Sequence, residues 1–339
     1  MTDVEQHAVN KKAVVAKLRS ICSIPIEELD SAIEAVFTAD AKLFAFHPVN
    51  EHVGPAAIAD SLWRPIRESF PDIERRDQIV ISGDYKDHAF VCAMSRLQGT
   101  FENDWLDIPA SHGAVSLRCC EVNQVADGKI VEAHVLIDVL DLMHQVGCWP
   151  IAPSLGAEGM WHSPATQDGV KLGSVDPESG AAALKLVKDM HAGLLAFDGK
   201  DLASMQLAQY WTPNFMWYGP SGIGTTRGLK GFEAHHQIPF LRAFPDRKVA
   251  NHIANVYDGN YVITGGWPSV IATHTGPDWL NIAATGKQIG MRVMDFYRVE
   301  DGLIAENWVP IDIVDILRQM GVDVFARLRH LRGRPRTTL

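Results

Sequence analysis

The chain has 339 residues, a length that favours two domains, each large enough to bury a core of its own. Apolar residues make up 47% of the chain and charged residues 21%, which excludes a mainly disordered or collagen-like protein. The formal net charge of -10 argues against a general nucleic-acid-binding protein, because neutralising phosphate groups requires a basic surface.

The N-terminal segment, the cysteines and the histidines carry no signal for export or metal binding. The polar N-terminus lacks the apolar core of a signal peptide, and no apolar run approaches the roughly 20 residues of a membrane span. Five cysteines without a CxxC spacing favour buried, reduced thiols over disulfides or a zinc site. The histidines are scattered without ligand spacing. We therefore expect a soluble cytoplasmic protein that holds no metal and binds neither membranes nor nucleic acid.

The sequence repeats itself after 174 residues. The stretch IVEAHVLIDVLDLMHQVG at 130–147 returns as IAENWVPIDIVDILRQMG at 304–321. The same shift aligns Phe70-Pro71-Asp72 with Phe244-Pro245-Asp246, Trp105-Leu106 with Trp279-Leu280, Arg118 with Arg292, and Asp138 with Asp312. A period this long indicates a whole domain that was copied. We predict a first domain at 1–147, a linker at 148–178, a second domain at 179–321 and a basic tail at 322–339.

Each copy predicts the same elements in chain order. Helical spacing of apolar residues at 26–37 and 181–210 is followed by the short strands KLFAFHP and NFMWYGP, and then by helices at 54–70 and 228–244 that end at Phe-Pro-Asp. Four strands follow, at 75–83, 88–100, 113–126 and 129–137 in the first copy and at 247–257, 260–275, 287–300 and 303–310 in the second. Asp138 and Asp312 then begin a last helix as N-caps, and Gly147 and Gly321 end it.

This order indicates an α+β fold in which helices pack inside one strongly curved antiparallel sheet. The stretches GLKGF at 228–232, FLRAFPD at 240–246, THTG at 273–276, FYRVEDG at 296–302 and ENW at 306–308 resemble the SnoaL-like polyketide cyclases of the nuclear transport factor 2-like superfamily. The resemblance implies two tandem cone-shaped domains. It also implies sheet-to-sheet pairing of the copies as a pseudo-dimer within one chain, and leaves a further homodimer open.

The resemblance also implies where the polar pocket residues lie. The position of the cyclases' general acid/base aspartate falls on Val309, two residues after Asn307, so neither copy keeps that acid. The second polar position falls on Asp295, and on Glu121 in the first copy. Strand alternation places Asp295 on the same face as Tyr297; if that face is the apolar interior, burial raises the pKa of Asp295 and makes it a competent base or acid.

The alternative is that Asp295 or Glu121 pairs with a nearby arginine such as Arg292 or Arg118. His236, placed four residues from both Phe232 and Phe240, and Tyr218 are the further catalytic candidates, although His236 fits a core histidine as well. The remaining substrate-binding candidates are Trp267, Asn307, Val309, His47, Glu121 and Arg64. Arg64 belongs to the Ser-Leu-Trp-Arg stretch that replaces the histidines in the first copy, which suggests a different ligand, an anion, or none.

Two functions from different classes follow. The first is a cofactor-free lyase, isomerase or cyclase that moves a proton on a small, mostly apolar carbonyl or hydroxyl compound, with its active pocket in the second domain. The second is a non-catalytic binding protein for such a small hydrophobic ligand.

Overall fold

The computed structural model describes residues 3–277 and 279–332, which form two compact units. The first unit contains the described residues up to Pro150, Val170–Ser174 and those from Val322 onward. The second contains Ile151–Gly169 and Val175–Gly321. The segment expected as a linker is therefore divided between the units, and the described part of the tail belongs to the first. Residues 333–339 of the predicted tail lie outside the described residues.

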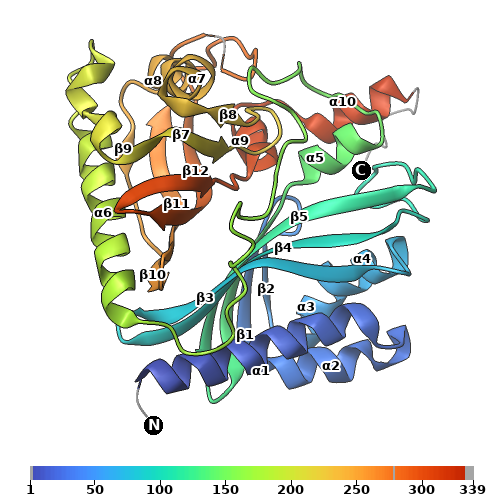
Figure 1. Cartoon of the computed structure of the whole chain (residues 1–339). Helices are drawn as coiled ribbons and strands as arrows, with labels where there is room; N and C mark the ends of the chain where they lie inside the picture. The colour runs from blue at the N-terminus through green and yellow to red at the C-terminus, as the bar shows by residue number, and fades with distance from the viewer. Residues whose placement is uncertain (1–2, 278, 333–339) are drawn as a thin grey trace. The chain divides into compact units, whose positions relative to one another are not determined.

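The first unit has one sheet in the order β2-β1-β6-β5-β4-β3. Its strands are β1 (Phe37–Ala45), β2 (Glu51–Val53), β3 (Glu74–Tyr85), β4 (His88–Thr100), β5 (Ala114–Ala126) and β6 (Lys129–Ile137). Its helices are α1 (Asp3–Ser23), α2 (Leu29–Val36), α3 (Pro55–Ile58), α4 (Arg64–Ser69), α5 (Val139–Gln145) and α10 (Val324–Leu331). Helix α1 packs across β3 and β4 (Figure 1).

The second unit has the sheet order β10-β11-β12-β13-β7-β8, with β9 paired to β11. Its strands are β7 (Trp211–Tyr218), β8 (Thr226–Arg227), β9 (Lys248–Val249), β10 (Ala254–Asp258), β11 (Tyr261–Thr273), β12 (Gln288–Glu300) and β13 (Leu303–Trp308). Its helices are α6 (Pro177–Leu195), α7 (Gly228–Phe232), α8 (Ile238–Ala243) and α9 (Ile313–Gln319). Helix α6 lies beside β10 and β11 (Figure 1).

The predicted α+β class is confirmed, but neither sheet is wholly antiparallel. In each unit one pair is parallel, β1 with β6 and β7 with β13. Helices and further strands separate the members of each pair along the chain, β2–β5 in the first unit and β8–β12 in the second, and this long connection lets the later strand return in the same direction.

Both copies interrupt the same helix with a π-helical turn. The turn spans Ala59–Trp63 between α3 and α4, and Glu233–Gln237 between α7 and α8. These positions correspond after the shift of 174 residues. Such turns insert an extra residue and re-aim side chains, often at functional sites. In the second copy the turn carries His235 and His236.

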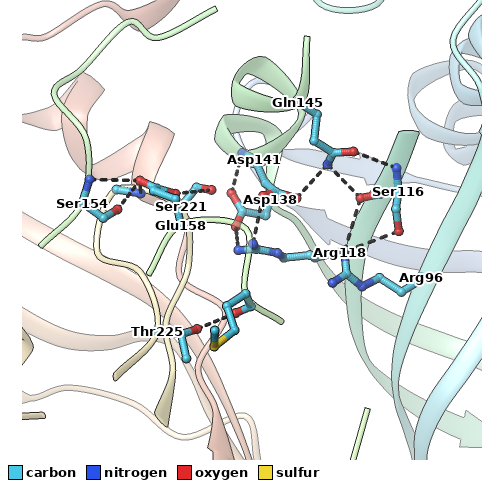
Figure 2. A network of polar contacts seen from close by, with 12 residues as sticks. Arg96, Ser116, Arg118, Asp138, Asp141, Gln145, Ser154, Glu158, Ser221 and Thr225 are labelled. Atoms are coloured by element: carbon cyan, nitrogen blue, oxygen red, sulfur yellow. Dashed lines mark hydrogen bonds and ion pairs between the residues drawn. The ribbon is translucent and has the colours of Figure 1, made fainter. Parts of the chain in front are cut away.

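The acids retained between the copies anchor the closing helices. In the first unit, the Asp138 carboxylate caps α5 by accepting from the Asp141 amide at 3.0 Å. Figure 2 shows Arg118 between Asp138 and Asp141, at 2.9 Å from each carboxylate. The Gln145 side chain then bonds to Asp141 and to Ser116.

The second unit repeats this arrangement. Asp312 caps α9 by accepting from the Asp315 amide at 3.0 Å, and Arg292 lies 3.1 Å from Asp312 and 3.6 Å from Asp315. The two predicted N-caps are confirmed, and Gly147 and Gly321 end these helices with positive φ angles. The residues that survived the duplication therefore include those that hold each closing helix on its sheet.

Three elements differ from the sequence prediction. Helix α1 was not predicted, because its apolar residues form no sharp stripe. The helix predicted at 181–210 ends at Leu195. The strand predicted at 247–257 is split into β9 and β10, because the chain between them bonds to an irregular stretch of β11 around Pro268, which has no amide proton to donate.

Residues Ile151–Gly169, called the covering segment from here on, lie on one face of the second sheet. Ala157 forms an isolated bridge with Thr225. The His162 carbonyl accepts from the Trp308 indole at 2.8 Å, and Asp168 accepts from the Tyr261 hydroxyl at 2.6 Å. Trp161 is buried in the segment's contact with Tyr218. This face is thus occupied by the chain's own backbone and aromatic side chains.

Candidate active site in the second unit

The pairing register decides which side chains share a face of the second sheet. Thr264 pairs with Asp295, and Asn307 pairs with both Tyr297 and Trp217. Paired residues point to the same side of a sheet, and so do residues two apart in one strand. These five side chains therefore lie on one face, opposite to the face that the covering segment occupies.

Asp295 is an acid among neutral hydrogen-bond donors. Its carboxylate accepts hydrogen bonds from the side chains of Tyr297 and Asn307. A second amide proton of Asn307 goes to the Phe296 carbonyl at 3.0 Å. Burial raises the pKa of Asp295 to about 7, and the two hydrogen bonds only partly oppose that rise. The residue is nevertheless partly exposed. Within the described residues it has no ion-pair partner, since Arg292 bonds to the acids of α9.

Tyr297 links Asp295 to helix α6. The tyrosine is buried and bonds to the Thr264 hydroxyl as well as to Asp295. Its hydroxyl oxygen also lies 2.9 Å from Nε2 of His191 on α6. Burial holds the pKa of Tyr297 well above its usual value and lowers the pKa of His191 to about 4. Both groups are therefore neutral at physiological pH. We call Thr264, Asp295, Tyr297, Asn307 and His191 the Asp295 cluster.

His236 lies on the same side of the sheet, among aromatic rings. Its ring stacks on Trp217 with centroids 4.1 Å apart, and the rings of Phe232 and Phe240 lie at 5.3 and 5.6 Å. Burial lowers the pKa of His236 to about 3, so the imidazole is neutral. Its Nδ1 is buried and has no hydrogen-bond partner among the described residues. His235, its neighbour in the π-helical turn, is exposed.

Two other candidates lie on the opposite face. Tyr218 stacks on Trp308 at 5.2 Å and donates to Glu306 at 3.3 Å, so the structure does not bring it together with Asp295. Trp267 lies 5.0 Å from the guanidinium of Arg292. Arg292 and Asp295 are an odd number of residues apart in one strand, so Trp267 is also on the side away from the acid.

Val309 keeps the place that the resemblance gives to the general acid. Its amide donates to the Tyr218 carbonyl at 2.9 Å, which continues the pairing of β13 with β7. Because it is two residues beyond Asn307, its buried side chain points to the Asn307 face. This position therefore adds an apolar wall and no second acid.

The first unit gives its corresponding acid a different environment. Glu121 is buried and forms an ion pair with Arg75, which also bonds to Asp77 at 2.7 Å. The alternative of pairing with an arginine thus holds for Glu121, although the partner is Arg75 and not the expected Arg118. Glu121 is therefore held in an ion pair with a buried guanidinium, a contact that Asp295 does not make among the described residues.

The remaining first-copy candidates are not joined to Glu121 by the contacts that the structure gives them. Arg64 pairs with Asp60 and Asp30 at the protein surface. The ring of His47 lies 6.2 Å from Phe325 of α10. In place of His236 and Trp217 the first copy has leucines, Leu62 and Leu43.

Sequence reasoning missed His191, Thr264 and Trp217. Tyr218 and Trp217 are neighbours in one strand and point to opposite faces, because a shift of one residue changes the face that a side chain takes. The pairing of Asn307 with Trp217 supplies the correct parity, but only the structure shows it. His191 follows the buried Val187 by four residues, so its place on the buried stripe of a helix was a readable signal.

Among residues 3–277 and 279–332, no group of three or more His, Cys, Asp or Glu side chains is placed to hold a metal ion. None of the helices in that part of the chain is long and apolar enough to cross a membrane.

Each unit is thus an α+β domain with helices on one mixed sheet, and the second holds an isolated acid on its inner strands. The SnoaL-like polyketide cyclase family matches residues 30–146 and 195–320. The chain therefore belongs to this family and contains two copies of its domain. No curated protein matches the chain significantly.

Solved structures of this fold are similar to one half of the chain each. A SnoaL-like polyketide cyclase candidate from Jannaschia sp. CCS1 is 19% identical, with a TM-score of 0.36, and the match covers 44% of this chain and 98% of that protein. IdmH, a polyketide cyclase candidate from Streptomyces antibioticus, is 17% identical with a TM-score of 0.34, over 40% of this chain and 98% of its own. An NTF2-like protein from Burkholderia xenovorans LB400 is 17% identical with a TM-score of 0.34, over 42% of this chain and 98% of its own.

Proposed function

We propose that the second unit is a cofactor-free lyase, isomerase or cyclase that transfers a proton on a small, mostly apolar carbonyl or hydroxyl compound. Asp295 is the proton acceptor and donor. His236, as a neutral imidazole, donates a hydrogen bond to the substrate oxygen. Membership of a family of cyclases supports the reaction class, and the substrate and the pocket belong to the proposal.

The observation that carries this proposal is the isolation of Asp295. Asp295 is largely withdrawn from water but still partly exposed, it pairs with no cation among the described residues, and its pKa is raised to about 7. General acid–base catalysis works best when the pKa of the group lies close to the working pH. Glu121 of the first unit is instead bound to the guanidinium of Arg75, which favours the second unit as the catalytic one.

The chemistry needs only the groups described. The Asp295 carboxylate takes a proton from the carbon next to the substrate carbonyl, and the electron pair moves onto the carbonyl oxygen. His236 stabilises the developing charge on that oxygen by hydrogen bonding. Protonated Asp295 then returns the proton to carbon or to oxygen. The aromatic rings around His236 and the side chain of Val309 provide apolar walls.

Proton transfer to a carboxylate can be tested without knowing the natural substrate. We expect the protein to speed hydrogen–deuterium exchange at the acidic carbon of some members of a panel of ketones and 1,3-diketones, followed by NMR. Asp295→Asn should lower this exchange by about 100-fold or more, because a general base contributes roughly that factor. Asp301→Asn, in an exposed turn, is the matched control and should exchange as the wild type does. Equal exchange by wild type and Asp295→Asn would contradict the proposal.

A binding protein is the second candidate, and the valine at position 309 is the observation that favours it. A family member without the usual acid could retain a ligand and leave it unchanged. Native mass spectrometry of the purified protein would then show a bound small molecule that is released intact on unfolding. Exchange catalysis that depends on Asp295 would exclude this alternative. The expected sheet-to-sheet pairing of the two copies stays a prediction.

A further inference from the structure

The contact between His191 and Tyr297 joins the helix α6 to the strand that carries the acid. Nε2 of His191 lies 2.9 Å from the Tyr297 hydroxyl oxygen, which is a hydrogen-bonding distance. Tyr297 is at the same time bonded to Asp295 and to Thr264. The tyrosine oxygen therefore has three partners, and it has only one proton with which to serve them.

Counting protons gives each of these bonds a direction. An ionised carboxylate can only accept hydrogen bonds, so the single hydroxyl proton of Tyr297 must point to Asp295. The two lone pairs of the tyrosine oxygen are then left as acceptors for the other two partners. Thr264 supplies one proton from its hydroxyl. His191, which is neutral, must supply the second from Nε2, so its own proton sits on that nitrogen.

The first copy has different residues at the positions of His191, Tyr297 and Thr264, which form this hydrogen-bond network in the second copy. The residue 174 positions before His191 is Lys17, whose ammonium group donates to the Gly128 carbonyl at 2.6 Å. Asn123 stands in place of Tyr297, and its Nδ2 has no hydrogen-bond partner among the described residues. Ala93 is paired with Glu121 where Thr264 is paired with Asp295. The copy whose acid is bound to an arginine lacks this hydrogen-bond network, and the copy whose acid has no cation partner in the described part of the chain has the complete network.

We propose that His191 is a positioning residue. Its Nε2–H donates to the Tyr297 oxygen and thereby keeps the tyrosine O–H pointing at the Asp295 carboxylate. The hydrogen bond from Tyr297 supports the ionised form of Asp295 and orients it toward the substrate. This role rests on the proposed function for its use in catalysis. The hydrogen-bond chain itself can be measured without any substrate. The bonds polarise one another, so a donor at the far end of the chain strengthens the bond at the carboxylate.

Among the described residues, few other titrating groups act on the hydrogen-bond network of His191, Tyr297 and Asp295. Tyr297 is the titrating group bonded to Asp295, and Thr264 and Asn307 do not titrate. Next to His191, the additional titrating group is His252, whose electrostatic interaction lowers the pKa of His191. A test must therefore separate the hydrogen bond of His191 from the charge of His252.

The test is a double-mutant cycle on the titration of Asp295. The carboxyl carbons of aspartate are labelled with 13C in the full chain, and the Asp295 signal is assigned by its loss in Asp295→Asn. We expect Tyr297→Phe to raise the pKa of Asp295 by about one to two pH units, because a hydrogen bond to a charged group is lost. His191→Phe should raise it by about 0.2 to 0.5 of a pH unit. In the Tyr297→Phe background, His191→Phe should cause no further change.

A merely structural histidine gives a different pattern. If His191 acts through burial or packing, His191→Phe shifts the Asp295 titration equally with and without the Tyr297 hydroxyl, and the proposal is overturned. It is also overturned if His252→Gln shifts the titration as much as His191→Phe does. His191→Gln, which keeps an N–H donor, should titrate close to the wild type and serves if the phenylalanine variant fails to fold.

The outcomes remain separate from those of the exchange assay. Loss of the proposed function with an intact cycle would leave His191 as the residue that orients Tyr297 in a binding site. A failed mutant cycle with intact catalysis would overturn only the positioning role of His191 and would leave the proposed function standing.

Discussion

Asp295 and Glu121 occupy the same place in the two copies and differ in what surrounds their charge. Burial penalises both carboxylates, since an ion loses favourable solvation when it leaves water. The first copy offsets this penalty with the buried guanidinium of Arg75. Among the described residues, the second copy offers Asp295 hydrogen bonds from Tyr297 and Asn307 and no cation, and the pKa of Asp295 rises to about 7. The residue proposed to be catalytic is therefore one whose charge destabilises its own domain.

This destabilisation has a definite pH dependence. The pKa of Asp295 is higher in the folded chain than in an unfolded one, so the folded state binds more protons between about pH 4 and pH 7. The contribution of Asp295 to stability is then fully favourable below about pH 4 and is lost as the pH rises to about 7. We expect Asp295→Asn, which cannot ionise, to gain stability relative to the wild type over this range, by about 4 kcal/mol at most.

Urea unfolding of both proteins at about pH 5 and pH 8 measures this difference. Asp301→Asn is the control, and its stability relative to the wild type should not change with pH, because Asp301 is exposed. A constant difference between Asp295→Asn and the wild type would mean that Asp295 is solvated like an ordinary surface acid.

At the scale of elements, the residues that both copies share were the ones from which secondary structure could be predicted. Asp138 and Asp312 cap the closing helices as predicted. An aspartate directly before an apolar helical run is a strong N-cap signal, because its side chain can accept a hydrogen bond from a backbone amide of the first turn. The hairpins and most strand boundaries follow equally from local pattern. The sequence could not show which face of the sheet each strand residue takes, or which residues far apart in the sequence come into contact. Tyr218 and Trp217 are adjacent letters on opposite faces, and His191 meets Tyr297 across 106 positions.

The covering segment shows the same limit for an element with no period. Its composition of Gly, Pro and Ser indicates a linker, yet Trp161 is only 3% exposed within it. Backbone bridges and single aromatic side chains fix this segment on the sheet, and neither leaves a repeating pattern in the sequence.

We expect Trp161→Ala to destabilise the second unit by about 3 to 5 kcal/mol, because removing a large buried aromatic side chain leaves a cavity. Trp149→Ala is the matched control, since Trp149 is 40% exposed, and it should cost much less. Denaturant unfolding, with circular dichroism as the signal, compares the two variants. Equal losses would mean that the segment is not packed on the sheet through Trp161.

At the scale of the molecule, the two units are interleaved along the chain. The first unit receives α10 from beyond the end of the second. Val324 and Leu328 of this helix are buried, and Arg329 pairs with Asp107 of the first unit. The segment that the sequence predicts as a basic tail thus contributes a helix to the core of the first unit, which precedes the second unit along the chain.

Leu328→Ala should therefore weaken the first unit, by about 2 to 4 kcal/mol. Leu331→Ala on the same helix is the control, because Leu331 is 60% exposed and Leu328 is fully buried. Hydrogen exchange resolved by peptide locates the effect: we expect faster exchange in β1–β6 and unchanged exchange in β7–β13. Faster exchange confined to the second unit would show that α10 stabilises that unit instead.

Interleaving also sets the order in which a growing chain can finish its parts. A ribosome releases the whole second unit once Gly321 has emerged, but the first unit still lacks α10 at that moment. Domains usually complete folding from the N-terminus during synthesis. Here the N-terminal copy must wait, and the copy made later is expected to reach its native state first.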